Sequence, residues 1–422
     1  MRLLLCILCL IITATQPTTT TTSSSDELPY NSRPCYTSST TTDTLLTNYC
    51  RPSYLIIGAG KAGTSSLYNY LLDHPDVLPA ESKQTHYWKY DHKPNSVNSL
   101  KKYYAHFPRS WEFHLSPDGT TQKVVGESSP GYLTDEMAAT YIKRELPGVK
   151  IIVVIRDPVE RAMSSYRYNY LHMIGTDGRG LNGNTKKKSH TSRRKKRTKD
   201  NVPMENEDER YNHLEAIISD SGEIISSSAT SASTHVTFSE FVKAEMAFLR
   251  SCADPNTKNI MKSCLTDTST LDAQWSNITK ATPSGELKEL KTHSSYLVRS
   301  MLGRGFYRNQ LEGWEREHDV KVVCVEHLTR DEGGAVLTDV ADFIGLADFD
   351  FTDTLKSKGV YNYGRNTGYG RSTTWDEFER KKRAGGGGID ENLRAELIEF
   401  YKEFGEWDYF ASRCGWSNNN LE

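Results

Sequence analysis

The sequence predicts an α/β protein with a parallel β-sheet that is flanked by helices on both faces. Three short, almost continuously apolar and partly β-branched runs are typical of strands buried on both sides: Tyr54 to Ile57, Val149 to Ile155 and Val320 to Val325. Helical patterns follow the first two runs. Because strands of this type alternate with helices, crossover connections and a parallel sheet are favoured over hairpins.

The individual elements follow from local signals. Tyr54 to Ile57 runs into a Gly-rich turn, and a helical pattern begins at Ser65 and stops before Pro75. After the second strand, Pro158 suits the first turn of a helix. Near the end, ENLRAELIEFYKEFGEW has apolar residues at helical spacing and predicts one terminal amphipathic helix.

The remaining segments suggest the domain organisation. Residues 1–14 have the basic, apolar and small-residue layout of a signal peptide or short signal anchor, and the Thr- and Ser-rich residues 15–50 are typical of a stalk. We expect one catalytic domain over 51–416, since a chain of 422 residues exceeds a single core of about 250 to 300 residues only modestly. Within it, residues 176–233 are rich in Gly, Asn, Ser and charge and predict a disordered insertion.

Composition and cysteines limit the functional classes. The net charge is only −2, so the whole protein offers no general attraction for nucleic acid or another polyanion, and any anion site must be local. Without the leader the chain keeps six cysteines, an even number that suits an oxidising compartment. Cys252 and Cys264 form the best candidate pair, and Asn277 begins a glycosylation sequon.

The Gly-rich turn from Gly58 to Ser66 (GAGKAGTSS) predicts an anion cradle. Glycines let backbone N–H groups approach a phosphate, and the following helix N-terminus adds partial positive charge. The turn also matches G-x-G-x-x-G, so an NAD-type dinucleotide enzyme is one alternative, with Glu81 as its acidic partner; a plain tight turn is another. The nucleoside triphosphatase pattern is excluded, because Lys61 precedes Gly63.

A second anion site is indicated by Arg156 and Ser164, which follow the second strand eight residues apart. Two helical turns separate them, so both side chains are expected to face the crevice at the carboxyl ends of the strands. A guanidinium and a hydroxyl suit a phosphate monoester. Together with the Gly-rich turn, this pair implies a nucleotide with two separate anionic ends.

These motifs resemble those of the carbohydrate sulfotransferases. KAGTSS after YLIIGAG is similar to their 5'-phosphosulfate loop, and RDPVERAMSSY to their 3'-phosphate motif. Similarity continues in GESSPGYL and in GRGFYRNQLEGWEREHDVKVVCVEHL, nearest to the N-acetylgalactosamine 4-sulfate 6-O-sulfotransferases. The resemblance implies a sulfotransferase fold like that of the P-loop kinases. It also implies the donor PAPS (3'-phosphoadenosine 5'-phosphosulfate), a glycosaminoglycan-like acceptor and a Golgi-lumen location, with no metal.

Transferred by position, the resemblance assigns the donor-binding residues. Lys61 would contact the bridging oxygen of the leaving phosphosulfate. The 5'-phosphate would be held by the loop residues Ala62, Gly63, Thr64 and Ser65. The 3'-phosphate would be held by Arg156 and Ser164, with two further arginines from a later Gly-rich segment, Arg365 and Arg371.

On the acceptor side the sequence departs from the family. Many relatives have Lys-Glu-x-His, in which the Glu accepts the hydroxyl proton, but here Gln84 replaces it. His86 matches the family's His and is the expected base, with Glu81 as a weaker candidate. An inactive glycan-binding protein of the same fold is the alternative. Four more side chains are candidates for the acceptor cleft or simply for structural positions: Tyr87, Trp88, Glu127 and Tyr132.

Overall fold

The computed structural model describes residues 49–109, 123–167, 237–254, 260, 264, 301–361, 372–383 and 389–416. The expected leader, nearly all of the expected stalk and the expected insertion lie outside these ranges, as do Arg365, Arg371 and the Asn277 sequon.

The centre of the molecule is a five-stranded sheet in the order β2-β3-β1-β4-β5, and every neighbouring pair is parallel. Its strands are β1 (Tyr54–Gly58), β2 (Val77–Leu78), β3 (Val124–Glu127), β4 (Lys150–Ile155) and β5 (Val320–Cys324). The predicted α/β class and parallel sheet are therefore confirmed. The two short strands β2 and β3 were not predicted.

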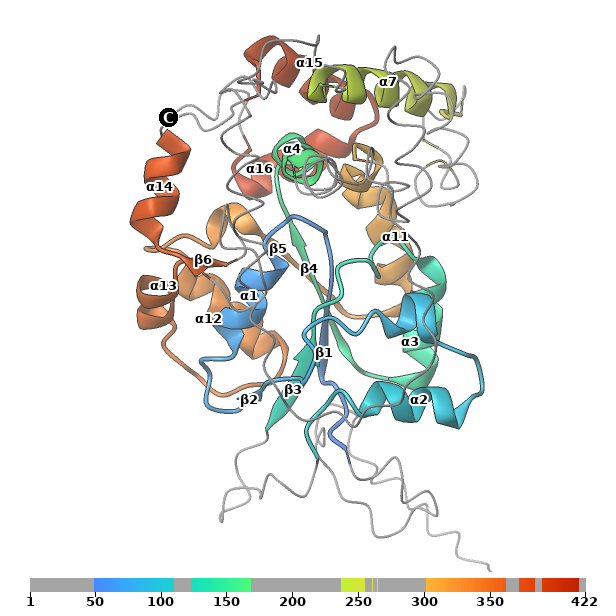
Figure 1. Ribbon diagram of the computed structural model, residues 1–422, viewed down its shortest axis with the longest axis vertical. Coiled ribbons are helices and arrows are strands. Elements are labelled where there is room, and N and C mark those ends of the chain that lie inside the picture. Colours follow the sequence, from blue (N-terminus) through green and yellow to red (C-terminus); the bar gives the residue numbers. More distant parts are fainter. Residues whose placement is uncertain are drawn as a thin grey trace, which may run out of the picture.

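Two of the predicted apolar runs form β1 and β4, adjacent strands inside the sheet, and the third forms the edge strand β5. Every residue of β1 is buried, and in β4 only Lys150 is not. Helices α1 (Thr64–Leu71), α12 (Gly333–Phe343) and α13 (Thr352–Lys358) lie on one side, and α2 (Val97–Tyr104), α3 (Glu136–Glu145) and α11 (Tyr307–Glu317) on the other (Figure 1). Covering both faces removes the β-branched side chains from water and stabilises the sheet.

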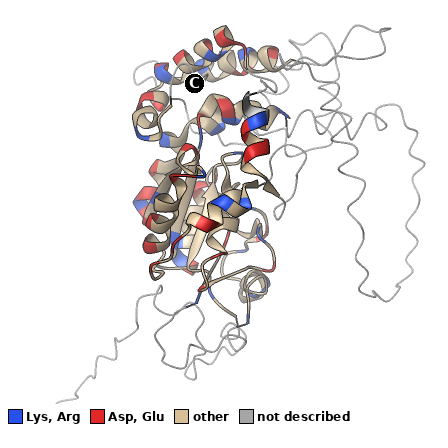
Figure 2. Cartoon of the chain, turned by 90° about the vertical axis from the view of Figure 1, so that its left-hand side faces the viewer, with Lys and Arg blue, Asp and Glu red and all other residues tan. Residues whose placement is uncertain are grey.

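A layer of helices lies beyond the carboxyl ends of the strands, at the top of Figure 1. It contains α4 (Pro158–Ser165), α7 (Phe238–Ser251), α15 (Glu391–Glu403) and α16 (Glu406–Cys414). The shorter elements are η2 (Tyr87–Asp91), η5 (Gly303–Gly305), η6 (Val325–His327), β6 (Val360–Tyr361), β7 (Ser372–Thr373) and α14 (Trp375–Arg383). Figure 2 shows basic and acidic positions interspersed over the described helices, in keeping with the nearly neutral composition.

Two helix predictions can be compared with the structure. Pro158 occupies the first turn of α4 as expected, and Asp157 caps that helix by accepting hydrogen bonds from the N–H groups of Val159 and Glu160. The predicted terminal helix is confirmed from Glu391 to Glu403 as α15, but the predicted segment runs on past a break into the start of α16. Gly405 adopts φ 68° and separates α15 from α16, because a left-handed residue ends one helix and lets the next begin at a new angle.

Two disulfides join described residues. Cys252–Cys264 confirms the predicted pair, and Cys324–Cys414 connects the end of β5 to the end of α16 across a sequence separation of 90 residues. Within the described ranges, no helix has the length and apolar character needed to cross a membrane.

Candidate active site

The Gly-rich turn forms a tight loop between β1 and α1. Gly63 has φ 92°, and a Cβ placed on it would lie 2.6 Å from Cγ2 of Val325, so only glycine fits both the backbone and the space. Helix α1 starts immediately afterwards with the buried residues Thr64 and Ser65. The strand, loop and helix thus have the arrangement that exposes backbone N–H groups to an anion.

Lys61 and Arg156 come together at this loop, although 95 positions separate them in the sequence. Burial and the positive charge of Arg156 lower the pKa of Lys61 to about 8. The two cations therefore repel each other across one region, at the carboxyl ends of the adjacent strands β1 and β4. The chain leaves β1 toward β2 and leaves β4 toward β5, in opposite directions, so these ends border the crevice where open α/β sheets bind ligands.

Buried charged groups hold the start of α4 and with it Arg156. The Asp157 carboxylate accepts a 2.5 Å hydrogen bond from Arg394 on α15, and the Asp157 N–H donates to Glu326 at 2.7 Å. The Tyr307 hydroxyl donates to the Arg156 carbonyl at 2.8 Å. The guanidinium of Arg156 is about one third exposed and pairs with Glu160 at 3.3 Å, so it remains accessible from solvent.

Ser164 lies half-buried on α4. No described contact joins its side chain to Arg156, and their cooperation at a 3'-phosphate stays a prediction.

The loop also has two arginine neighbours that the sequence analysis did not single out. Arg161, fully buried on α4, donates to the Gly60 carbonyl at 3.5 Å. Arg304 in η5 has its Nη1 atom 3.5 Å from the position of a Cβ on Gly60. Arg161 is part of the RDPVER motif and Arg304 of GRGFYRNQ. The sequence spacing of these motifs does not indicate that both arginines reach Gly60.

The expected acceptor side is organised around Glu127, at the end of β3 and completely buried. Its carboxylate accepts hydrogen bonds from the hydroxyls of Thr85 at 3.0 Å, Tyr132 at 2.8 Å and Ser129 at 2.6 Å, and from the Thr85 N–H at 3.4 Å. Burial raises the pKa of Glu127, while these donors oppose the shift. Four donors make it a structural anchor that fixes the segment around Thr85.

His86 follows this anchor in a left-handed conformation with φ 54°. Its N–H donates to the Ser129 hydroxyl at 3.0 Å, and its ring lies 6.0 Å from the ring of Tyr90, centroid to centroid. A positive φ at a non-glycine residue costs free energy and is often kept at functional sites. The half-buried ring is therefore held next to Tyr90, whose side chain is 54% exposed.

Lys83 is a buried cation on the acceptor side. Its ammonium group donates to the Ser128 carbonyl at 3.4 Å, and burial lowers its pKa to about 7, against the opposing effect of Glu127.

The other acceptor-side candidates divide by burial. Tyr132, Tyr87 and Trp88 are at most 3% exposed and belong to the core, so stacking on a sugar ring is excluded for them. Glu81 is exposed, and its backbone N–H donates to the His106 carbonyl at 2.8 Å. Tyr90, which the sequence analysis did not consider, is the exposed aromatic residue of this segment.

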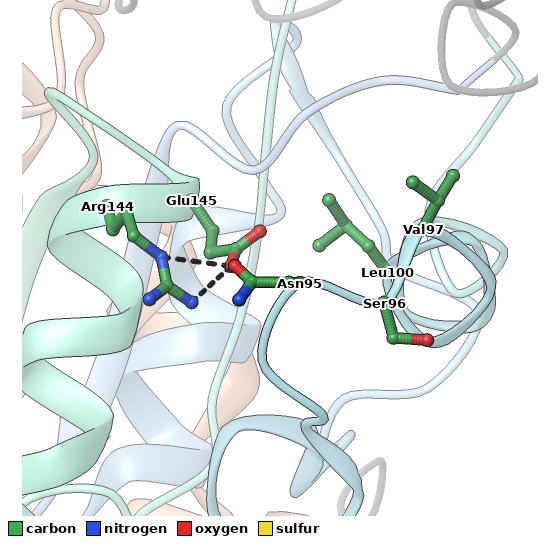
Figure 3. Close-up of a pocket in the computed structure, with 6 residues that line it drawn as sticks. All are labelled: Asn95, Ser96, Val97, Leu100, Arg144 and Glu145. Atoms are coloured by element: carbon green, nitrogen blue, oxygen red, sulfur yellow. Dashed lines mark hydrogen bonds and ion pairs between the residues drawn. The ribbon is translucent and has the colours of Figure 1, made fainter.

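A pocket lined by described residues lies elsewhere. Figure 3 shows it between the start of α2 and the end of α3, with a volume of about 280 Å³. Arg144 pairs with Glu145 at 2.6 Å on its wall. The end of α3 leads into the amino end of β4, so this pocket is at the edge of the sheet opposite Lys61 and His86. Among the described residues, no group of three or more His, Cys, Asp or Glu side chains could hold a metal ion.

Fold and loop geometry together define the class of an α/β protein with a Gly-rich loop and nearby cations at the carboxyl ends of β1 and β4. No protein-family model matches the sequence. One segment of 120 residues is 32% identical to the membrane-associated sulfotransferase kil1 of Dictyostelium discoideum, and 126 residues are 29% identical to a bifunctional heparan sulfate N-deacetylase/N-sulfotransferase of Mus musculus. A third match, of 115 residues at 30% identity, is to a heparan sulfate glucosamine 3-O-sulfotransferase of Mus musculus.

These matches confirm the resemblance to carbohydrate sulfotransferases over 27 to 29% of the chain. The matched segments span only 13 to 30% of the relatives' own length. Among solved structures, a match to a sulfotransferase from Alicyclobacillus acidocaldarius extends over 87% of this chain and 97% of that protein, with a TM-score of 0.40 and 17% sequence identity.

Proposed function

We propose that this protein is a PAPS-dependent sulfotransferase that transfers a sulfuryl group to a hydroxyl of a glycosaminoglycan-like glycan in the lumen of the secretory pathway. The observation that carries the proposal is the proximity of two cations, Lys61 and Arg156, at the Gly-rich loop, where burial and the Arg156 charge lower the pKa of Lys61 to about 8. Two cations that repel each other in the absence of an anion gain stability when a polyanionic donor binds between them.

The donor side of the proposed mechanism needs only positioning and electrostatics. The N–H groups at Gly63, Thr64 and Ser65 would hold the 5'-phosphate, and Arg156 with Ser164 the 3'-phosphate. The acceptor oxygen attacks sulfur while the bond from sulfur to the bridging oxygen breaks, leaving adenosine 3',5'-bisphosphate. Protonated Lys61 stabilises the negative charge that develops on that oxygen, as in phosphoryl transfer.

On the acceptor side His86 would take the proton of the attacking hydroxyl. Its support comes from the Glu127 anchor, which holds Thr85 and Ser129 and through Ser129 the His86 backbone. An imidazole is a suitable base near neutral pH, whereas the amide of Gln84 cannot accept a proton. Tyr90, exposed beside His86, would offer a face on which a sugar ring can stack.

The decisive experiment measures transfer of radiolabelled sulfate from PAPS to chondroitin, dermatan, heparan and galactan chains. Label is expected on at least one glycan for the wild type and is expected to be lost in Lys61→Ala. His86→Ala should lower kcat about 10²- to 10⁴-fold, the usual contribution of a general base. His318→Gln is the matched control, because His318 precedes the amino end of β5 at the opposite edge of the sheet.

The replacement of a family glutamate by Gln84 favours a second candidate, a glycan-binding protein without activity. Gln84→Glu separates the two. An inactive wild type that gains activity with this change would support the binding protein. An active wild type that is abolished by His86→Ala supports the enzyme.

A further inference from the structure

Arg304 lies at the Gly-rich loop without having a role in the proposed function. Its Nη1 atom is 3.5 Å from the position of a Cβ on Gly60, the residue directly before Lys61. The Arg304 guanidinium therefore lies beside the backbone of the loop, at ordinary van der Waals distance from a Cβ at that position. A side chain with five N–H donors therefore stands beside the residues expected to cradle an anion.

The turn that carries Arg304 is held by an unusual number of buried groups. Glu245 of α7, fully buried, accepts hydrogen bonds from the N–H groups of Met301 at 3.2 Å, Leu302 at 3.0 Å and Gly303 at 3.5 Å. Three donors on one buried carboxylate fix the backbone of a segment that has no helix or strand of its own at Met301 and Leu302.

Further contacts fasten the same turn from its other sides. The Gln310 side-chain amide donates to the Gly303 carbonyl at 3.2 Å, and the Tyr401 hydroxyl donates to the Leu302 carbonyl at 2.9 Å. Arg161 donates to the Met301 carbonyl and also to Gly60, so one buried arginine joins the Arg304 turn to the loop. The two segments are thereby held in a fixed relation.

Four cations gather around Gly60: Lys61, Arg156, Arg161 and Arg304. The described carboxylates nearby are each bound to other groups: Glu245 by backbone N–H groups, Asp157 by Arg394 and the start of α4, Glu160 by Arg156 and Arg394, and Glu326 by the Asp157 N–H. Preorganised cations in a partly buried site bind anions more strongly than the same groups in water.

We propose that Arg304 is a donor-binding residue that contacts the 5'-phosphosulfate of the nucleotide. The proposal rests on the proposed function, since it names one more contact to the same donor. The 5' end is indicated because Gly60 adjoins Lys61 and the N-terminus of α1. When the bond to sulfur breaks, negative charge grows on the 5'-phosphate, and a guanidinium placed there also favours transfer.

The test compares nucleotide binding by the full chain carrying Arg304→Ala, Arg304→Lys or Arg316→Ala. Arg316 is the matched control, an exposed arginine on α11, at the end away from the loop. Two probes are used: adenosine 3',5'-bisphosphate, by calorimetry, and adenosine 3'-phosphate, by ligand-observed NMR if binding is weak. Thermal unfolding of each variant reports whether the fold is kept.

Arg304→Ala is expected to weaken adenosine 3',5'-bisphosphate about ten- to a hundredfold, as the loss of a charge-assisted contact does. Arg304→Lys should recover part of the affinity, and neither change should affect adenosine 3'-phosphate by more than about twofold. Equal losses on both probes would place Arg304 away from the 5' end and overturn the proposal, as would wild-type affinity in Arg304→Ala. If the wild type binds neither nucleotide, the proposed function itself fails.

Discussion

Lys61 shows how the charge state of one residue can control donor binding. Its pKa is lowered to about 8 by burial and by Arg156, below the usual value of about 10.4. An anionic donor binds the protonated ammonium group, so raising the pH through 8 removes a proton that binding requires. Affinity for adenosine 3',5'-bisphosphate should fall about tenfold between pH 7 and pH 9.

The measurement is the dissociation constant across that range for wild type and Lys61→Arg. The guanidinium stays charged, so the variant should show a flat profile whatever its absolute affinity. A decline of equal steepness in both proteins would assign the titration to another group.

Gly63 carries two separable constraints. Alanine at this position must adopt φ 92° and place its Cβ 2.6 Å from Cγ2 of Val325. The backbone conformation alone costs about 1–2 kcal/mol, and the clash adds to it. We expect Gly63→Ala to lower the free energy of unfolding by more than 2 kcal/mol, by the sum of those two terms, and to abolish nucleotide binding.

Gly345→Ala is the control for the backbone term, because Gly345 has φ 79° and open space around its Cβ position. Denaturant unfolding of Gly63→Ala, Gly345→Ala and the double variant Gly63→Ala/Val325→Ala separates the terms. If Gly63→Ala costs no more than Gly345→Ala, the packing of Val325 against the loop is not a constraint.

At the scale of elements, Glu406 joins the start of α16 to the start of α11. Its buried carboxylate accepts hydrogen bonds from the N–H groups of Arg308 at 2.9 Å and Asn309 at 3.2 Å, which satisfies donors in the first turn of α11. Burial nevertheless dominates and raises its pKa to about 7. The folded protein therefore binds a proton more tightly here than the unfolded chain does.

The sign of the pH dependence follows from that difference. A raised pKa contributes stability below the unfolded value of about 4.3, and this contribution is lost as the pH rises toward 7. We expect the free energy of unfolding to lose up to about 3 kcal/mol from this group between pH 4.5 and 7. Glu406→Gln should remove that slope in denaturant titrations, whereas an unchanged slope would mean that Glu406 is already ionised at pH 5.

Some of the strands and helices could be predicted from the sequence, and others could not. The strands β1, β4 and β5 were predicted because each is an almost continuous run of apolar residues, a pattern typical of strands covered on both faces. The structure shows that full burial for β1 and nearly all of β4, whereas the edge strand β5 is only half-buried from Val320 to Val322. Strand β2 has two residues, and β3 ends in the polar Glu127, so neither produces a period that can be recognised. The terminal helices appeared as one because the apolar spacing continues past Gly405, and only the backbone shows the break.

The candidate site was predictable only in part for a similar reason. Local motifs pointed to the Gly-rich loop and to Arg156, but the proximity that lets the Arg156 charge lower the pKa of Lys61 depends on the pairing of β1 with β4. Arg304 and Glu245 are distant in sequence from the loop and follow no spacing rule. The burial of Tyr132, Tyr87 and Trp88 is likewise a property of the assembled core. The sequence alone does not distinguish an aromatic residue that lines a cleft from one that packs in the interior.

For the molecule as a whole, the Cys324–Cys414 disulfide links the sheet to the C-terminal helices. It joins the end of β5, next to Val325 and therefore next to the Gly63 contact, to the end of α16. Its loop spans 90 residues, against 12 for Cys252–Cys264. In the chain-entropy model the longer loop is worth about 4–5 kcal/mol and the shorter about 3 kcal/mol, because a longer closed loop restricts the unfolded chain more.

Replacing Cys324 and Cys414 together by alanine should therefore lower the free energy of unfolding by more than the double alanine variant of Cys252 and Cys264 does. Because Val325, the residue directly after β5, packs against the loop at Gly63, the first variant should also weaken binding of adenosine 3',5'-bisphosphate, and the second should not. Denaturant unfolding and calorimetry on the same two proteins measure both effects. Equal stability losses with unchanged affinity would show that helix packing alone, without the covalent link, keeps the end of β5 against the donor loop.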